Sequence, residues 1–260
     1  MASDELIYVV EDGIGRVTFN RPAARNALTF GMYDRLAEIC AGIKLGGAVK
    51  VLVITGAGDK AFAAGTDISQ FREFKTPEQG IAYEHRADEI FTAIDTCPVP
   101  TIAALAGACT GGGAGIAACC DIRLATRDMR YGFPIARTLG NCLSAATLRR
   151  LVAVAGQTRV ADMLLTARLI EAEEAHTIGL VNEVLDDHPA LMARTDALAH
   201  RLIEHAPLTM QVTKELLRRL RNTSGPVNDD ELIAKIYTSH DFREGMDAFL
   251  GKRKPSWQGR

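Results

Sequence analysis

The fold of this 260-residue chain is decided by residues 99–121, which read VPTIAALAGACTGGGAGIAACCD. The apolar run at residues 102–106 has the length of a buried strand. A turn at Gly107 leads to Gly111, Gly112 and Gly113, after which small and apolar residues continue as a tightly packed helix. Three consecutive glycines cost backbone entropy, so they are favoured where the backbone bends sharply or lies against a ligand.

Two explanations fit this glycine turn. A strand, a turn and a helix start leave backbone N–H groups free, with the positive end of the helix dipole behind them. Such a turn binds a phosphate or stabilises a developing oxyanion. The same residues also fit a close-packed structural turn without a ligand.

The composition excludes several classes of partner. Hydrophobic residues make up 47% of the chain, and 30 basic against 32 acidic residues give a net charge of −2. This balance offers no electrostatic basis for binding nucleic acid or an anionic membrane. No apolar run reaches the roughly 18 residues of a membrane span, and the acidic start lacks a signal-peptide core. We therefore expect no nucleic-acid partner, no membrane partner and a cytoplasmic location.

The cysteine pattern argues against metal binding. The six cysteines form no Cys-x-x-Cys pair, and no histidine stands at a metal-ligand spacing from them or from another histidine. We predict buried thiols for most of the cysteines and no metal site.

Strands and helices alternate up to about residue 187. Asp12-Gly13 predicts a hairpin between strands at residues 6–10 and 16–20. A helix is predicted at residues 30–43, with Thr29 as its N-cap. A buried strand at residues 49–55 leads to a second glycine-bearing loop, in which Asp67 is a predicted helix cap. Residues 131–134 are predicted to form a loop.

The character changes after residue 187, because residues 188–260 predict only helices. Leu191, Leu198 and Leu202 share one helical face. Asp241 and Glu244 have the spacing of a capping box at the start of the last helix. We therefore expect an α/β body at residues 1–187 and a helical region at residues 188–260.

The two glycine-bearing loops, about 45 residues apart, resemble those of the crotonase (enoyl-CoA hydratase/isomerase) superfamily. The resemblance covers nearly the whole chain and depends on the order and spacing of several motifs. They are Arg25-Asn26-Ala27-Leu28, Ala63-Ala64-Gly65-Thr66-Asp67-Ile68, Gly111-Gly112-Gly113 through Cys120-Asp121-Ile122, Gly132 with Pro134, residues 172–181, and Arg243-Glu244-Gly245-Met246 with Lys252-Arg253.

The resemblance implies an α/β fold, a crotonase-like spiral of ββα units with a C-terminal helical region that serves trimerisation and closes over coenzyme A. It implies self-association as a trimer or a dimer of trimers. It also implies an acyl-CoA thioester as substrate, as in fatty acid metabolism, with no permanently bound cofactor. By position, the backbone N–H groups of Thr66 and Gly112 would form an oxyanion hole for a thioester enolate.

Residues for coenzyme A follow from the same resemblance. It places Arg25, Ala64, Asp67 and Ile68 at the coenzyme, with the loop at Ala64 against the adenine. Phe249 and Lys252 on the last helix would close over the nucleotide, from the same subunit or a neighbouring one. A solvated terminal charge is the alternative for Lys252.

The chain departs from the family pattern where the hydratases carry two catalytic glutamates. One position, two residues after the triple glycine, is Gly115 here. The other follows the Gly-x-Pro loop and is Ile135 here. Hydration needs one group to activate water and one to protonate carbon, and neither residue can do either.

Other polar residues offer replacements. Arg137 could pair with a substrate carboxylate, or it could form a structural ion pair. His85 could act as an acid or base near neutral pH, or it could lie on a solvated helix face. Glu84 and Asp88 share its helix, which borders the acyl pocket in relatives, and Tyr131, Asn141 and Cys142 flank the same predicted pocket wall.

Three hypotheses compete. The first is an acyl-CoA enzyme that stabilises an enolate for isomerisation or decarboxylation, without the water chemistry of the missing glutamates. The second is an enoyl-CoA hydratase whose acid and base are relocated, for example to Glu84 or His85. The third is a non-catalytic acyl-CoA-binding protein.

Overall fold

The structure is a computed structural model that describes residues 5–72, 74–223, 225 and 228–260. Its main sheet has the strand order β1-β2-β3-β5-β7-β10. Strands β2, β3, β5, β7 and β10 run parallel, and β1 is antiparallel to β2 at the edge. The strand bounds are β1 (Leu6–Glu11), β2 (Ile14–Phe19), β3 (Val51–Gly56), β5 (Thr101–Leu105), β7 (Ile122–Thr126) and β10 (Glu183–Leu185).

A second sheet of very short strands lies beside the first. It has the order β4-β6-β8-β9, with β4, β6 and β8 parallel and β9 antiparallel to β8. Its strands are β4 (Ala61–Ala63), β6 (Ala108–Thr110), β8 (Arg130–Gly132) and β9 (Ile170–Glu171). The loop prediction at residues 131–134 was therefore wrong for its first two residues. A strand of two or three residues is too short to show an alternating pattern.

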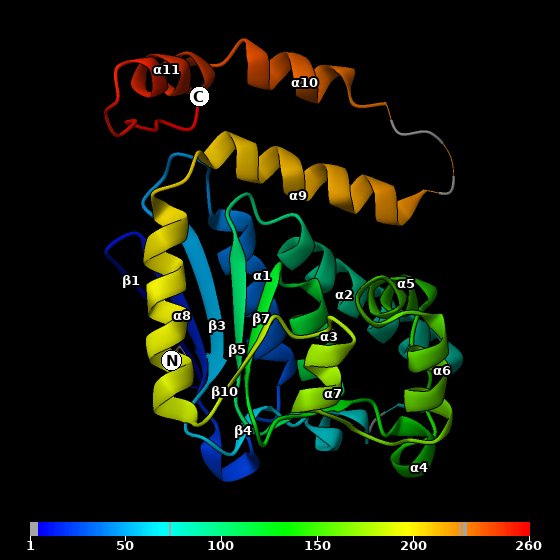
Figure 1. The fold of residues 1–260 in the computed structure, drawn as a ribbon. Coiled ribbons are helices and arrows are strands. Elements are labelled where there is room, and N and C mark those ends of the chain that lie inside the picture. The colour runs from blue at the N-terminus through cyan, green and yellow to red at the C-terminus, as the bar shows by residue number, and fades with distance from the viewer. Residues whose placement is uncertain (1–4, 73, 224, 226–227) are drawn as a thin grey trace.

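Helices cover both faces of the main sheet (Figure 1). On one face lie α1 (Phe30–Gly42), α2 (Pro77–Asp95), α3 (Gly112–Cys119), α5 (Ala145–Ala155) and α6 (Gln157–Leu165). On the other lies α8 (His188–Ile203), while α9 (Pro207–Asn222), α10 (Asp230–Tyr237) and α11 (His240–Leu250) lie above the sheet. The shorter helices are η1 (Pro22–Ala24), η2 (Ile68–Phe71), α4 (Ile135–Thr138) and α7 (Ala172–Thr177).

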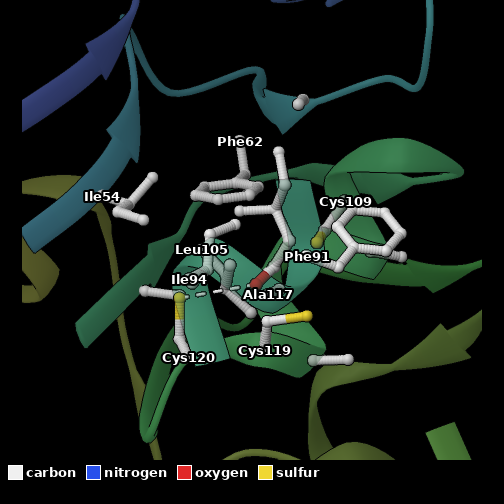
Figure 2. Close-up of a cluster of buried hydrophobic side chains, with 14 of the residues drawn as sticks. Ile54, Phe62, Phe91, Ile94, Leu105, Cys109, Ala117, Cys119 and Cys120 are labelled. Atoms are coloured by element: carbon white, nitrogen blue, oxygen red, sulfur yellow. Dashed lines mark hydrogen bonds between the residues drawn. The ribbon is translucent and has the colours of Figure 1, made fainter. Parts of the chain in front are cut away.

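Two apolar cores follow from the alternation of side chains along the buried strands. On β3, Leu52 and Ile54 point into the larger core, which α1, α2 and α3 cover. Val51 and Val53 point to the opposite face and join the core beneath α8. Figure 2 shows part of the larger core, where cysteine thiols pack among aromatic and aliphatic side chains.

The structure confirms the prediction of buried thiols for most cysteines. Cys40, Cys97, Cys109, Cys119 and Cys120 are buried, and Cys142 is exposed. Within the described parts of the chain, every helix is too short or too polar to cross a membrane.

Capping residues were predicted with mixed success. Thr29 and Asp67 cap α1 and η2, because their side chains accept hydrogen bonds from Met32 N and Ser69 N. Asp241 is not the cap of α11, since Ser239 accepts from Phe242 N in that position. The carboxylate of Asp241 instead accepts the N–H groups of residues 258 and 259, so it fixes the C-terminal tail.

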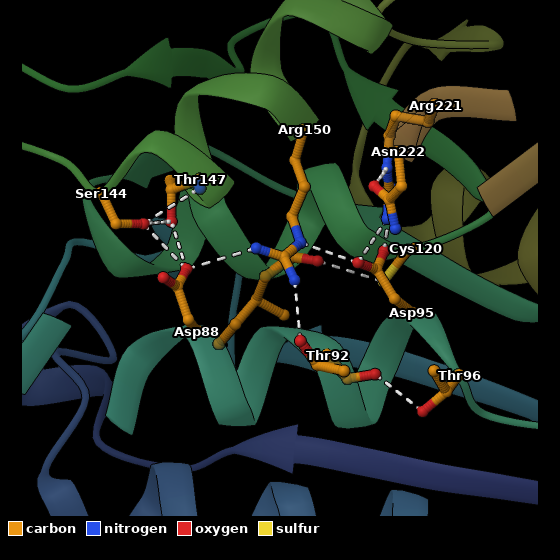
Figure 3. Close-up of polar contacts among 11 residues, drawn as sticks. Asp88, Thr92, Asp95, Thr96, Cys120, Ser144, Thr147, Arg150, Arg221 and Asn222 are labelled. Carbon is orange, nitrogen blue, oxygen red and sulfur yellow. Dashed lines mark hydrogen bonds and ion pairs between the residues drawn. The ribbon is translucent and has the colours of Figure 1, made fainter. Parts of the chain in front are cut away.

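A buried ionic cluster ties α5 and α9 to α2 (Figure 3). Arg150 on α5 is paired with Asp95, 2.7 Å from Nε to Oδ2, and its side chain is 8% exposed. Arg221 on α9 reaches the same carboxylate at 2.7 Å, and Asp95 is 5% exposed. Arg150 also donates to Thr92 Oγ1 and to Asp88 Oδ1. Because buried charges are costly without partners, the three helices hold one another in place.

We predict that Arg150→Ala lowers the free energy of unfolding by about 3 kcal/mol, since it removes one of two cations from a buried carboxylate. Arg127→Ala is the matched control, because its pair with Asp186 has side chains that are 67% and 77% exposed. That change should cost less than about 1 kcal/mol. Urea unfolding measures both, and equal losses would contradict the role of the cluster.

Candidate active site

The triple glycine lies at the start of α3, where each residue has its own steric reason to be glycine. Gly111 has a φ of +53°, which disfavours other residues. A Cβ on Gly112 would lie 1.6 Å from Tyr33 Oη, and a Cβ on Gly113 would lie 2.5 Å from the carbonyl oxygen of Ala63. The run therefore exists because the backbone passes directly against α1 and β4.

The second glycine-bearing loop is held by the segment at residues 25–28. Ala64 N donates to Arg25 O at 3.0 Å, and Leu28 N donates to Gly65 O at 2.8 Å. Asn26 is fully buried, and its amide donates to the carbonyl oxygens of Ala57 and Ala61. These bonds fix the backbone from Ala64 to Asp67.

The two loops touch. A Cβ on Gly111 would lie 3.2 Å from the Cα of Gly65, and a Cβ on Gly112 would lie 3.2 Å from Thr66 Oγ1. Among the residues that the structure describes, the N–H groups of Thr66 and Gly112 have no hydrogen-bond partner. The fold therefore brings together the two donors that were predicted for an oxyanion hole.

A cavity of about 850 Å³ opens between α2 and the segment that precedes α5. Its walls are mainly apolar and aromatic, with Phe71, Phe74 and Tyr83 in mutual edge contact. Leu139 and Cys142 contribute from the opposite side. Tyr83 also connects the cavity to the glycine loops, because its hydroxyl lies 3.1 Å from Thr66 Oγ1.

The carboxyl groups at the cavity belong to α2. Glu84 and Asp88 both line it, one helical turn apart. Glu84 accepts from Ser144 N at 3.1 Å, and Asp88 accepts from Ser144 Oγ at 2.8 Å. Burial raises the pKa of Glu84, and the charge of Asp88 raises it further, while the Ser144 N–H bond opposes both. Glu84 is thus a carboxyl group with a raised pKa in an apolar cavity.

Positions 115 and 135 are filled with apolar groups. Gly115 is buried, and a Cβ on it would lie 2.4 Å from Cζ of Phe91. The Phe91 ring on α2 thus occupies the space that a side chain at position 115 would need. Ile135 is half-buried and packs against the larger core.

The other side chains predicted for the pocket are divided among the cavity, the core and the surface. His85 is exposed and lines the cavity together with Asn141. Tyr131 is buried, and its hydroxyl donates to Ala114 O. Arg137 lies on α4, is exposed and is absent from the cavity lining; within the described chain its side chain has no ionic partner. The structure therefore does not bring Arg137 to the cavity beside Glu84.

The residues predicted for coenzyme A lie around the second loop. Arg25 and Ile68 are exposed there, and Ala64 is half-buried. Asp67 is engaged within the protein, because it accepts from Ser69 and from the Arg21 guanidinium. These hydrogen bonds lower the pKa of Asp67, with the larger contribution from Ser69 and a smaller one from Arg21.

Phe249 and Lys252 lie elsewhere. Phe249 is 84% exposed on α11, and Lys252 follows at the end of that helix. In Figure 1, α11 is at the opposite end of the molecule from β4, which leads into the Thr66 loop. Within one chain these residues are far from the residues around Ala64.

Sequence reasoning missed two hydroxyl groups beside Thr66. Tyr33 Oη lies 2.9 Å and Tyr83 Oη lies 3.1 Å from Thr66 Oγ1. Tyr33 comes from α1 and Tyr83 from α2, so no local spacing links them. The only sequence signal for these hydroxyl contacts was Thr66 itself, whose hydroxyl adds a polar group to a loop of otherwise small residues.

The fold first defines a class: parallel strands in two sheets, wound with intervening helices, form the α/β spiral of crotonase-like enzymes. The sequence profile of the enoyl-CoA hydratase/isomerase family matches residues 10–260. The chain belongs to this family, within the crotonase superfamily, and is an enzyme that processes acyl-CoA thioesters.

Individual relatives agree with this family. The chain is 31% identical over 257 residues to the short-chain-enoyl-CoA hydratase of Clostridium acetobutylicum, covering 98% of this chain and 97% of that protein. It is 30% identical over 259 residues to the 2,3-dehydroadipyl-CoA hydratase of Escherichia coli, with 98% and 99% covered. A solved enoyl-CoA hydratase/carnithine racemase from Magnetospirillum magneticum has a TM-score of 0.90 and 35% identity, with 99% and 97% covered.

We predict that Gly115→Ala lowers the free energy of unfolding by about 1–3 kcal/mol, because its methyl group overlaps the Phe91 ring. In a Phe91→Leu background the same change should be close to neutral, so a double-mutant cycle should show strong coupling. Gly80→Ala is the matched control, since no atom lies within 4 Å of its Cβ position in α2. Additive effects at positions 91 and 115 would contradict the overlap.

We predict that Glu84→Gln raises stability at pH 7 and that its advantage vanishes near pH 4. The pKa of Glu84 is raised in the folded state. The stabilising contribution of Glu84 is therefore present below the unfolded pKa and is lost as pH rises through the folded pKa. Glutamine does not titrate, so the variant avoids this loss at pH 7. Glu78→Gln should do the opposite, because hydrogen bonds lower the pKa of Glu78. Urea midpoints at both pH values test the signs, and a pH-independent difference for Glu84→Gln would exclude this linkage.

Proposed function

We propose that this enzyme converts an acyl-CoA thioester through an enolate, by decarboxylation or by double-bond isomerisation, and that it does not use the two-glutamate hydration. Two observations together carry the proposal. The N–H groups of Thr66 and Gly112 have no partner within the described parts of the chain, and positions 115 and 135 are filled with apolar groups. The first supports an oxyanion hole, and the second leaves no carboxylate where hydration would need it.

The chemistry of decarboxylation matches this set of groups. Loss of CO₂ from a 2-carboxyacyl-CoA leaves the bonding electron pair as an enolate, so no strong base is needed. Two fixed N–H donors would bind the enolate oxygen more tightly than the neutral carbonyl oxygen. In other enzymes each such donor is worth roughly 3–4 kcal/mol.

The other residues predicted from the sequence take supporting roles in this proposal. Arg25, Ala64, Asp67 and Ile68 would flank coenzyme A, with Asp67 shaping the loop through its bonds to Ser69 and Arg21. The distance of α11 from that loop favours Phe249 and Lys252 acting on a neighbouring subunit of a trimer or a dimer of trimers. Arg137 lies outside the cavity lining. It would orient a substrate carboxylate only if α4 moved toward the acyl chain or the acyl chain extended to α4.

A second candidate function is hydration with a relocated acid and base. Glu84 supports it, because this carboxyl lines the cavity, has a raised pKa and is oriented by the Ser144 N–H. His85 is the other candidate, on the rim of the same cavity. The names of the two relatives described above also favour hydration.

Purified protein given methylmalonyl-CoA and crotonyl-CoA separates these functions. We expect decarboxylation of the first and little hydration of the second. Gly112→Ala should lower kcat by about 10²–10³-fold, because its methyl group displaces Tyr33 and disturbs a donor of the oxyanion hole. Gly42→Ala is the control, since no atom lies within 4 Å of its Cβ position at the end of α1.

Rapid crotonyl-CoA hydration would refute the proposal in favour of the second candidate. In that case Glu84→Gln and His85→Ala would show which group carries the reaction. Thermal unfolding of each variant checks that a loss of activity does not reflect a loss of fold.

A further inference from the structure

Three hydroxyl groups form a continuous chain beside the glycine loops. Tyr33 Oη lies 2.9 Å from Thr66 Oγ1, and Thr66 Oγ1 lies 3.1 Å from Tyr83 Oη. Tyr33 Oη also fills the space left by the missing side chain of Gly112. The chain of hydroxyls thus passes both residues of the proposed oxyanion hole.

Burial decides which way these hydrogen bonds point. Tyr33 is 5% exposed, and within the described residues Thr66 Oγ1 is the hydrogen-bond partner of its hydroxyl. If Tyr33 only accepted, its own proton would be buried without an acceptor, which is unfavourable. Tyr33 therefore donates to Thr66, and Thr66 donates its own proton to Tyr83.

Among the described residues, this direction leaves the proton of Tyr83 without an acceptor. Because Tyr83 Oη accepts from Thr66, its O–H is free to point elsewhere, and Tyr83 lines the cavity. Its ring is fixed by Phe71, with centroids 4.9 Å apart, and by Phe30 at 5.9 Å. Burial raises the pKa of Tyr83, so the hydroxyl keeps its proton at neutral pH.

We propose that Tyr83 is the catalytic acid that protonates the substrate enolate, and that Tyr33 and Thr66 are positioning residues that direct its proton into the cavity. This inference rests on the proposed function. It assigns the proton donor that positions 115 and 135 cannot supply. A tyrosine hydroxyl is a competent proton donor when it is held within hydrogen-bond reach of the reacting atom.

The step balances for a 2-carboxyacyl-CoA. The bond between the α-carbon and the carboxylate breaks, CO₂ leaves, and the bonding pair forms the enolate. The enolate charge rests on the thioester oxygen, against Thr66 N–H and Gly112 N–H. The pair then forms a C–H bond with the Tyr83 proton, the carbonyl re-forms, and the tyrosinate takes a proton from water in the cavity.

The test follows the fate of the proton in short incubations of methylmalonyl-CoA in D₂O. The wild-type enzyme should give propionyl-CoA with one deuterium at C2 in a single configuration. Tyr83→Phe should lower turnover by about 10²-fold or more and give both configurations in the remaining product. Tyr237→Phe, an exposed hydroxyl on α10, should change neither the rate nor the configuration.

The positioning residues have a separate signature. Thr66→Val keeps the backbone N–H but breaks the hydroxyl chain, so it should reduce stereospecificity, while Thr66→Ser should restore it. Tyr33→Phe should resemble Thr66→Val. These variants keep the proposed oxyanion hole, so substrate affinity should change little.

The outcomes distinguish a failure of the decarboxylation from a failure of the role assigned to Tyr83. A wild-type enzyme that converts no methylmalonyl-CoA refutes the decarboxylation and removes the proton donor with it. A wild-type product with both configurations leaves decarboxylation intact and overturns the role of Tyr83. Wild-type rate and a single configuration in Tyr83→Phe would overturn it equally.

Discussion

The site depends on one steric constraint, the contact of two backbone segments without side chains between them. Gly65 meets Gly111, and Gly113 meets Ala63, at distances where even a methyl group would force movement. The pairing of β4 with β6 brings these segments together, and Asn26 fixes the first of them from beneath. The oxyanion hole proposed above depends on this contact, because it brings the loop of Thr66 against the loop of Gly112.

Polar groups are distributed unevenly around that point. On α3 and α4 the residues at positions 115 and 135 are apolar, and the Phe91 ring fills the space beside Gly115. The polar side chains at the cavity come from α2, which contributes Tyr83, Glu84 and Asp88. Family membership fixes the scaffold and the thioester substrate class, while the reaction depends on which side chains face the acyl group.

Much of the fold was predictable from the sequence, because its longer helices and strands carry clear apolar patterns. The strand, glycine turn and helix around Gly112 were predicted because apolar runs and glycines mark them directly. The short strands β4, β6, β8 and β9 were not, since two or three residues carry no period. Tyr33 and Tyr83 escaped notice because they meet only in three dimensions. Phe91 could not be linked to Gly115 from sequence, because the contact depends on how α2 crosses α3.

Position 66 has a consequence for how such an enzyme can change over evolution. Its backbone N–H is available whatever side chain the residue carries, whereas its hydroxyl exists only because the residue is threonine. In the proposed site, the main chain would bind the carbonyl oxygen, and replaceable side chains would handle the protons. A scaffold with this separation can exchange one reaction for another by point substitution while its affinity for thioesters is inherited unchanged.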